Sequence, residues 1–168
     1  MSLVFETQRL RLNPITMDGL DTLHRIFVDP FVRKYLCDDE IFSSQQVEEM
    51  LLENQTRFEA EKFGLWFIET KAEQEIIGFV GLWYFFDEDQ PQLIYALLPT
   101  ATQKGYATEA ATQILDYWFN ELNHAYLVAS SDKPNLESHK VAERLGMKQV
   151  EEKMIDGKPV LFFRVEKS

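Results

Sequence analysis

The chain has 168 residues, 45% of them hydrophobic and 13% aromatic, which predicts one folded domain over residues 1–168 rather than a disordered chain. A domain of this length buries roughly two thirds of the surface of its unfolded chain. With 28 acidic and 17 basic residues the formal charge is −11, which repels phosphate backbones and anionic lipid surfaces. We therefore expect neither a nucleic acid nor a membrane as a partner.

The longest apolar run, residues 78–86, is too short to span a bilayer, and residues 1–9 lack the basic and apolar regions of an export signal. Cys37 is the only cysteine, which excludes an intramolecular disulfide and fits a reducing compartment. We therefore expect a cytoplasmic protein. Beside Tyr35 and Leu36, Cys37 is typical of a small packing residue rather than a nucleophile. The three histidines show no ligand spacing, so we predict no metal.

The first half of the chain predicts a strand and then two helices. Alternating residues predict a strand at Thr7–Leu12, closed by Asn13-Pro14. Thr16 is a candidate cap for the first helix, and Ser43 with Gln46 forms a capping box for the second. The apolar faces of these two helices carry Leu20, Leu23, Phe27, Val47, Leu51, Leu52 and Phe58.

Three strands rich in aromatic and branched residues follow, at Gly64–Thr70, Ile76–Phe86 and Gln92–Leu98. The polar segments 71–75 and 87–90 between them are typical of hairpin turns. These elements predict an antiparallel meander.

Residues 99–110 combine a turn-rich loop with the start of an amphipathic helix. Gly105 allows close backbone approach, and the first N–H groups of the helix carry a partial positive charge, as in a phosphate-binding loop. The same residues also fit an ordinary helix start, in which Gly105 and Thr108 serve local geometry. The helix itself is well marked, with an apolar stripe of Ala107, Ala110, Ala111, Ile114, Leu115, Trp118 and Leu122.

The remaining residues predict a strand at Ala125–Ser130 and a helix that opens at Pro134-Asn135 and runs through Leu145. Gly146 is a typical C-terminal cap for this helix. A final hairpin has arms at Met147–Met154 and Pro159–Glu166, joined around Asp156-Gly157. The whole chain is therefore predicted to be a mixed α/β domain.

Residues 93–99 with 104–110, and residues 135–147, resemble the two signature segments of the GNAT acetyltransferases, most closely the ribosomal-protein N-acetyltransferase branch. Residues 9–12 and 77–81 extend the resemblance over most of the chain. It implies an α/β (α+β) fold with a mixed, mostly antiparallel central sheet, one splayed strand pair and about four flanking helices. It also implies acetyl-CoA as co-substrate and no metal.

In proteins of this family the loop binds the pyrophosphate of acetyl-CoA, and the strand before it offers backbone groups to the pantetheine arm. Carried over residue by residue, the resemblance implies cofactor contacts at Leu97, Leu98, Gln103, Lys104, Gly105, Tyr106, Ala107, Thr108, Asn135 and Ser138. Asn135 also fits the role of a helix N-cap, which is compatible with a contact to the cofactor.

Three positions depart from the family pattern. Thr102 stands where arginine or glutamine is common, and Gln103 where glycine is frequent, so we expect the loop to bind less tightly or to follow a different path. Ala142 stands where many relatives have a tyrosine that acts as general acid, as is usual in this branch. Ser138 becomes the candidate that hydrogen-bonds the departing thiolate, although a serine hydroxyl is a poor acid.

The resemblance implies an N-acetyltransferase in which a primary amine, of a protein N-terminus or a small molecule, attacks the thioester directly. A backbone N–H near Leu97 would stabilise the oxyanion. The proton of the amine needs a base, and the carboxylates after the second meander strand, Asp87, Glu88 and Asp89, are candidates, although acids in a turn are commonly just solvated. Glu109, in the first helical turn, is assigned to the helix dipole. The alternative function is a CoA-binding regulatory module without catalysis.

Overall fold

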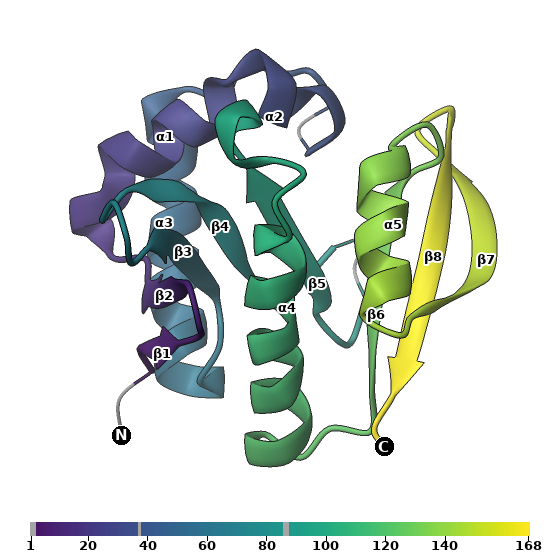
Figure 1. The fold of residues 1–168 in the computed structure, drawn as a ribbon. Coiled ribbons are helices and arrows are strands. Elements are labelled where there is room, and N and C mark those ends of the chain that lie inside the picture. Colours follow the sequence, from purple (N-terminus) through teal and green to yellow (C-terminus); the bar gives the residue numbers. More distant parts are fainter. Residues whose placement is uncertain (1–2, 37, 86–87) are drawn as a thin grey trace.

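The structure, a computed structural model, describes residues 3–36, 38–85 and 88–168. Its centre is an eight-stranded sheet in the order β1-β2-β3-β4-β5-β6-β8-β7 (Figure 1). The neighbouring strands are antiparallel except β5 and β6, so the sheet is mixed and mostly antiparallel, as expected. The strands are β1 (Phe5–Glu6), β2 (Leu10–Pro14), β3 (Leu65–Thr70), β4 (Ile76–Trp83), β5 (Gln92–Leu97), β6 (Tyr126–Asp132), β7 (Lys148–Ile155) and β8 (Lys158–Glu166).

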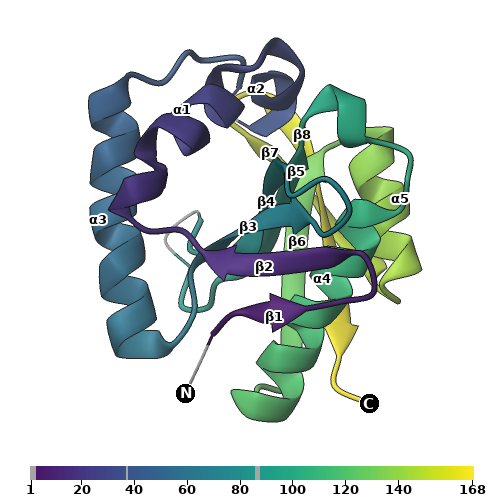
Figure 2. The ribbon, with the colours of Figure 1, turned by 60° about the vertical axis from the view of Figure 1, so that its left-hand side comes forward.

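Helices cover both faces of this sheet (Figures 1 and 2). On one face lie α1 (Leu20–Val28), α2 (Pro30–Leu36) and α3 (Ser44–Glu61), and on the other α4 (Tyr106–Asp116) and α5 (Leu136–Arg144). The predicted meander of β3, β4 and β5 is confirmed.

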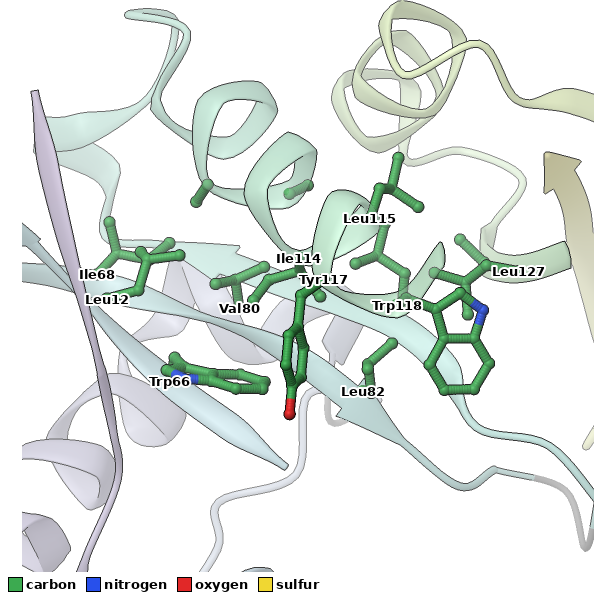
Figure 3. Close-up of a cluster of buried hydrophobic side chains, with 14 of the residues drawn as sticks. Leu12, Trp66, Ile68, Val80, Leu82, Ile114, Leu115, Tyr117, Trp118 and Leu127 are labelled. Carbon is green, nitrogen blue, oxygen red and sulfur yellow. The ribbon is translucent and has the colours of Figure 1, made fainter. Parts of the chain in front are cut away.

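The middle strands are apolar on both sides because both sides are buried. In β3, Leu65 and Phe67 pack with α1 and α3, whereas Trp66 and Ile68 pack with α4. The α4 side of this core is shown in Figure 3, with Leu12, Trp66, Ile68, Val80, Leu82, Ile114, Leu115, Tyr117, Trp118 and Leu127 labelled.

The splayed strand pair is β5 and β6. They are paired at a single position, Gln92 with Val128, and then diverge, while β5 stays paired with β4 up to Leu97. The helix α4 follows β5 and α5 follows β6, and both helices lie on the same face of the sheet (Figure 1).

Several local signals in the sequence are confirmed. Gln46 N–H donates to Ser43 Oγ over 3.1 Å, and Ser43 N–H to Gln46 Oε1 over 2.7 Å, which completes the capping box. Asn135 Oδ1 accepts the N–H of Ser138 over 3.3 Å and caps α5. Gly146 ends α5 with a φ of 85°, in the left-handed region that glycine tolerates.

The cap predicted at Thr16 is wrong, because Thr16 precedes a 3-10 turn and makes no capping hydrogen bond with its side chain. The sequence also missed α2, although Asp29-Pro30 is a helix-start signal: Asp29 Oδ1 accepts the N–H of Phe31 over 2.9 Å. The regular part of α4 ends at Asp116 and continues as a wider π turn, Tyr117–Glu121, that buries three successive aromatic side chains.

Two further observations hold for the described residues. None of their helices is both long and apolar enough to cross a membrane. No group of three or more histidine, cysteine, aspartate or glutamate side chains among them is arranged to hold a metal ion.

Candidate active site

A cavity of about 620 Å³ lies where β5 and β6 diverge. Its lining comes from the loop before α4 and the first turn of this helix, from β5, β6 and α5, from α2, and from β8 with the turn before it. It therefore joins the two signature segments, which are distant in sequence. The predicted site residues that line it are Leu97, Gln103, Gly105, Tyr106, Ala107, Thr108, Asn135 and Ser138.

The loop before α4 has the backbone of an anion-binding site. Gly105 is the N-cap of α4, with a φ of 81°, and its lack of a side chain leaves no capping oxygen for the N–H groups of the first turn. Those N–H groups and the helix dipole attract an anion at this end of α4. Gln103 has a φ of 62°, a conformation that favours glycine. A glutamine at this position, where glycine is frequent, is therefore energetically unfavourable.

The Thr108 hydroxyl is buried in the first turn of α4. Among the described residues, its Oγ1 is one of two buried side-chain polar atoms without a hydrogen-bond partner, the other being Thr70 Oγ1. A buried hydroxyl without a partner destabilises a protein. A phosphate oxygen at the end of α4 would give the Thr108 hydroxyl a partner, so the residues here fit the pyrophosphate of CoA.

The edge of β5 that faces the cavity carries backbone groups. Just beyond this strand, the Leu98 N–H donates to the Ile77 carbonyl over 2.8 Å, on the side of β4. Because successive residues of a strand direct their N–H groups to opposite edges, the Leu97 N–H is directed to the side of β6. Leu98 and Lys104 do not line the cavity, so of the ten predicted cofactor contacts these two lie outside its wall.

Ser138 lies in the first turn of α5 and contacts a side chain from β5. The Tyr95 hydroxyl is 2.9 Å from the Ser138 carbonyl oxygen and 3.0 Å from Ser138 Oγ. Burial raises the pKa of Tyr95 to about 12, although its hydrogen bond with Ser138 works in the opposite direction. The phenol therefore stays protonated at neutral pH and acts as a hydrogen-bond donor. Sequence reasoning missed Tyr95 because an aromatic residue in a strand is typical of packing.

Of the acids predicted as the base, Glu88 does not line the main cavity. Asp87 falls outside the described residues. Glu88 lines a second hollow of about 330 Å³ and accepts a hydrogen bond from Gln92 Nε2 over 2.6 Å. Gln92 Oε1 in turn accepts the hydroxyl of Ser130, also over 2.6 Å, and Ser130 lines the main cavity. Glu88 is thus connected to the cavity through two intervening side chains.

Charged residues lie at the side of the cavity formed by α2 and the β7–β8 turn. Lys158 Nζ is 3.3 Å from Asp38 Oδ1, an ion pair that links these two segments. Asp132, at the end of β6, lies close by: burial and the Asp38 carboxylate raise its pKa, and Lys158 opposes them. Asp132 also lines the cavity, and nothing in its sequence context marked it.

A family model described as acetyltransferase (GNAT) domain matches residues 9–148. YnaD, an uncharacterized N-acetyltransferase of Bacillus subtilis (strain 168), is 27% identical over 143 residues, or 85% of this chain and 81% of the relative. An acetyltransferase structure from Agrobacterium tumefaciens has a TM-score of 0.85 at 22% identity, over 99% of this chain and 95% of that chain. RimL, a ribosomal alpha-N-protein acetyltransferase in complex with coenzyme A, has a TM-score of 0.83 at 12% identity, over 97% of each chain. The family match spans most of the chain, which therefore belongs to the GNAT acetyltransferase family.

Proposed function

We propose that this acetyltransferase moves the acetyl group of acetyl-CoA to a primary amine of a peptide or a small molecule, with the whole chain acting as one catalytic domain. The observation that carries the proposal is the cavity that joins the start of α4, with its unpartnered Thr108 hydroxyl, to the diverging strands β5 and β6. A structural neighbour, RimL, is itself described as a complex with coenzyme A, which supports the choice of donor.

The donor is held at the two signature segments. The backbone N–H groups of residues 104–108 and the Thr108 hydroxyl bind its pyrophosphate. Leu97 and Asn135, which line the cavity, contact its pantetheine arm. The chain has a net charge of −11 and therefore repels the negatively charged pyrophosphate. The helix dipole at the start of α4 offsets part of this repulsion.

The transfer itself needs a hydrogen-bond donor to the oxyanion, a hydrogen-bond donor to the departing thiolate and a base for the amine proton. The Leu97 N–H is the candidate donor to the oxyanion, and Ser138, oriented by Tyr95, donates to the departing sulfur. Among the carboxylates that line the cavity, Asp132 is the candidate base, because a carboxylate with a raised pKa accepts a proton more readily than an ordinary one. Asp87 and Glu88 remain predictions for the same role.

The test is a titration of acetyl-CoA by calorimetry, followed by a screen of amines for CoA thiol release. Micromolar binding with release by at least one amine is the expected result. Binding without release by any amine in a broad panel favours the non-catalytic module, for which the alanine at position 142 is the supporting observation. Absence of binding rejects both functions.

Thr108→Val is expected to weaken CoA binding by about fivefold while leaving the protein as stable as before, or more stable. Valine has nearly the shape of threonine, and it removes a buried hydroxyl that has no hydrogen-bond partner among the described residues. Calorimetry and thermal unfolding measure the two effects. Thr112→Val is a matched control on the same helix, because the Thr112 hydroxyl already donates to the Thr108 carbonyl over 2.7 Å. Equal affinities of Thr108→Val and the native protein would remove this hydroxyl from the site.

Ser138→Ala is expected to lower turnover about tenfold and to change the dissociation constant of CoA less than twofold, because its hydroxyl acts on the leaving sulfur. Tyr95→Phe should show a smaller loss of turnover, since it removes only the contacts of the Tyr95 hydroxyl that orient Ser138. With a Tyr95 pKa of about 12, the rate profile of the native enzyme should show no Tyr95 titration below pH 10. Unchanged turnover in Ser138→Ala would exclude Ser138 from the mechanism.

A further inference from the structure

Arg9, just before β2, makes three contacts with the loop that precedes α4 and with the first turn of that helix. Its Nε is 2.7 Å from Glu109 Oε1. Its Nη1 donates to the Lys104 carbonyl over 2.9 Å, and its guanidinium lies 4.4 Å from the centroid of the Tyr106 ring. The planar fork of arginine suits such simultaneous contacts, which a lysine ammonium cannot reproduce.

Glu109 anchors this arginine to the body of the protein. Its Oε2 accepts the Thr7 hydroxyl over 2.5 Å and the Arg9 N–H over 2.9 Å. Burial alone would raise the pKa of Glu109, but the hydrogen bonds from Thr7 and Arg9 outweigh it and hold the pKa below its usual value. Glu109 is therefore ionised at neutral pH. Besides placing a favourable charge at the start of α4, it holds Arg9 in position.

The contact with the Lys104 carbonyl sets the direction of the next N–H group. In a trans peptide the C=O and the N–H point in opposite directions, so an Arg9 side chain bound to the Lys104 carbonyl directs the Gly105 N–H away from Arg9. Gly105 lines the cavity, and the Arg9 contact therefore fixes a backbone donor of the anion-binding loop.

We propose that Arg9 and Glu109 are positioning residues for the pyrophosphate of CoA, an inference that rests on the proposed function. Arg9 holds the peptide between Lys104 and Gly105 in its binding orientation, and Glu109 with Thr7 holds Arg9. The role is one of orientation rather than of added positive charge, because the Arg9 charge is already balanced by Glu109. Charge alone at position 9 is therefore insufficient.

The experiment compares CoA, titrated by calorimetry, with pantetheine, which lacks the pyrophosphate, titrated by amide shifts in NMR spectra that detect millimolar binding. Arg9→Ala and Arg9→Lys are both expected to weaken CoA binding about tenfold and pantetheine binding less than twofold. Arg11→Ala is the matched control, since Arg11 lies two residues further along, its side chain is 44% exposed against 43% for Arg9, and it pairs with Glu6 over 3.1 Å. It should leave both ligands unaffected.

Each contrary result has a distinct meaning. Native affinity for CoA in Arg9→Lys would show that charge suffices and would overturn the inference, as would an equal loss for CoA and pantetheine in Arg9→Ala. If Arg9→Ala does not fold, Glu109→Gln replaces it, because the amide keeps the shape and loses the charge-assisted bond to Arg9. Failure of the native protein to bind CoA rejects the proposed function itself, whereas failure of the variants to differ from the native protein rejects only the role of Arg9 and Glu109.

Discussion

Gly105→Val is expected to abolish CoA binding, with a dissociation constant raised at least about 100-fold. The φ of 81° at Gly105 is strongly disfavoured for a β-branched residue, so valine must turn this backbone to a negative φ. An added Cβ would also lie 3.4 Å from Arg9 Nη2. The change redirects the N–H groups of Gly105 and Tyr106, which bind the pyrophosphate in the proposed function. Calorimetry with CoA measures the effect.

The control is Gly146→Val, at the end of α5. Gly146 has a similar φ of 85° and its Cβ would meet only Val165 Cγ2, at 4.0 Å, so the substitution imposes the same kind of backbone strain away from the loop. It should lower the free energy of unfolding by roughly 1–2 kcal/mol and leave the affinity for CoA intact. Undiminished CoA affinity in a folded Gly105→Val protein would refute the anion-binding role of the loop.

The features that the sequence revealed are those in which neighbouring residues determine the structure. The capping box of Ser43 and Gln46, the cap at Asn135 and the left-handed Gly146 depend on residues no more than four positions apart. The start of α4 at Gly105 belongs to the same class. Local propensities were therefore enough to outline the meander and the helix α4, whereas the two signature segments came from the resemblance to the family.

The contacts that complete the site join residues far apart in the sequence. Tyr95 and Ser138 are 43 positions apart, and Arg9 and Glu109 are 100 positions apart. No periodicity or spacing identifies such pairs, because they form only when the sheet brings β2, β5 and the two helices together. For this reason the side chain of Tyr95 was not singled out, and Glu109 was assigned to the helix dipole only.

Gly78→Ala is expected to destabilise the fold strongly and, unlike its control, to weaken CoA binding. An added Cβ would lie 2.0 Å from the Ala96 carbonyl oxygen, and a backbone atom cannot move aside by changing a rotamer. β4 and β5 must separate, at an expected cost of roughly 3 kcal/mol in the free energy of unfolding. The shift falls on Ala96 and Leu97, which line the cavity beside the proposed pantetheine arm.

Gly81→Ala, on the same strand, separates the two effects. Its Cβ would lie 2.1 Å from the Gly64 carbonyl oxygen, so the strain falls on the β3 side of β4 and leaves β5 in place. Urea unfolding should show similar losses of stability for both variants. Calorimetry well below their melting temperatures should show weaker CoA binding in Gly78→Ala alone, because only that substitution displaces the strand beside the donor. Equal CoA affinities in the two variants would mean that β5 does not accompany the pantetheine arm, while the anion-binding loop before α4 would remain supported by its own test at Gly105.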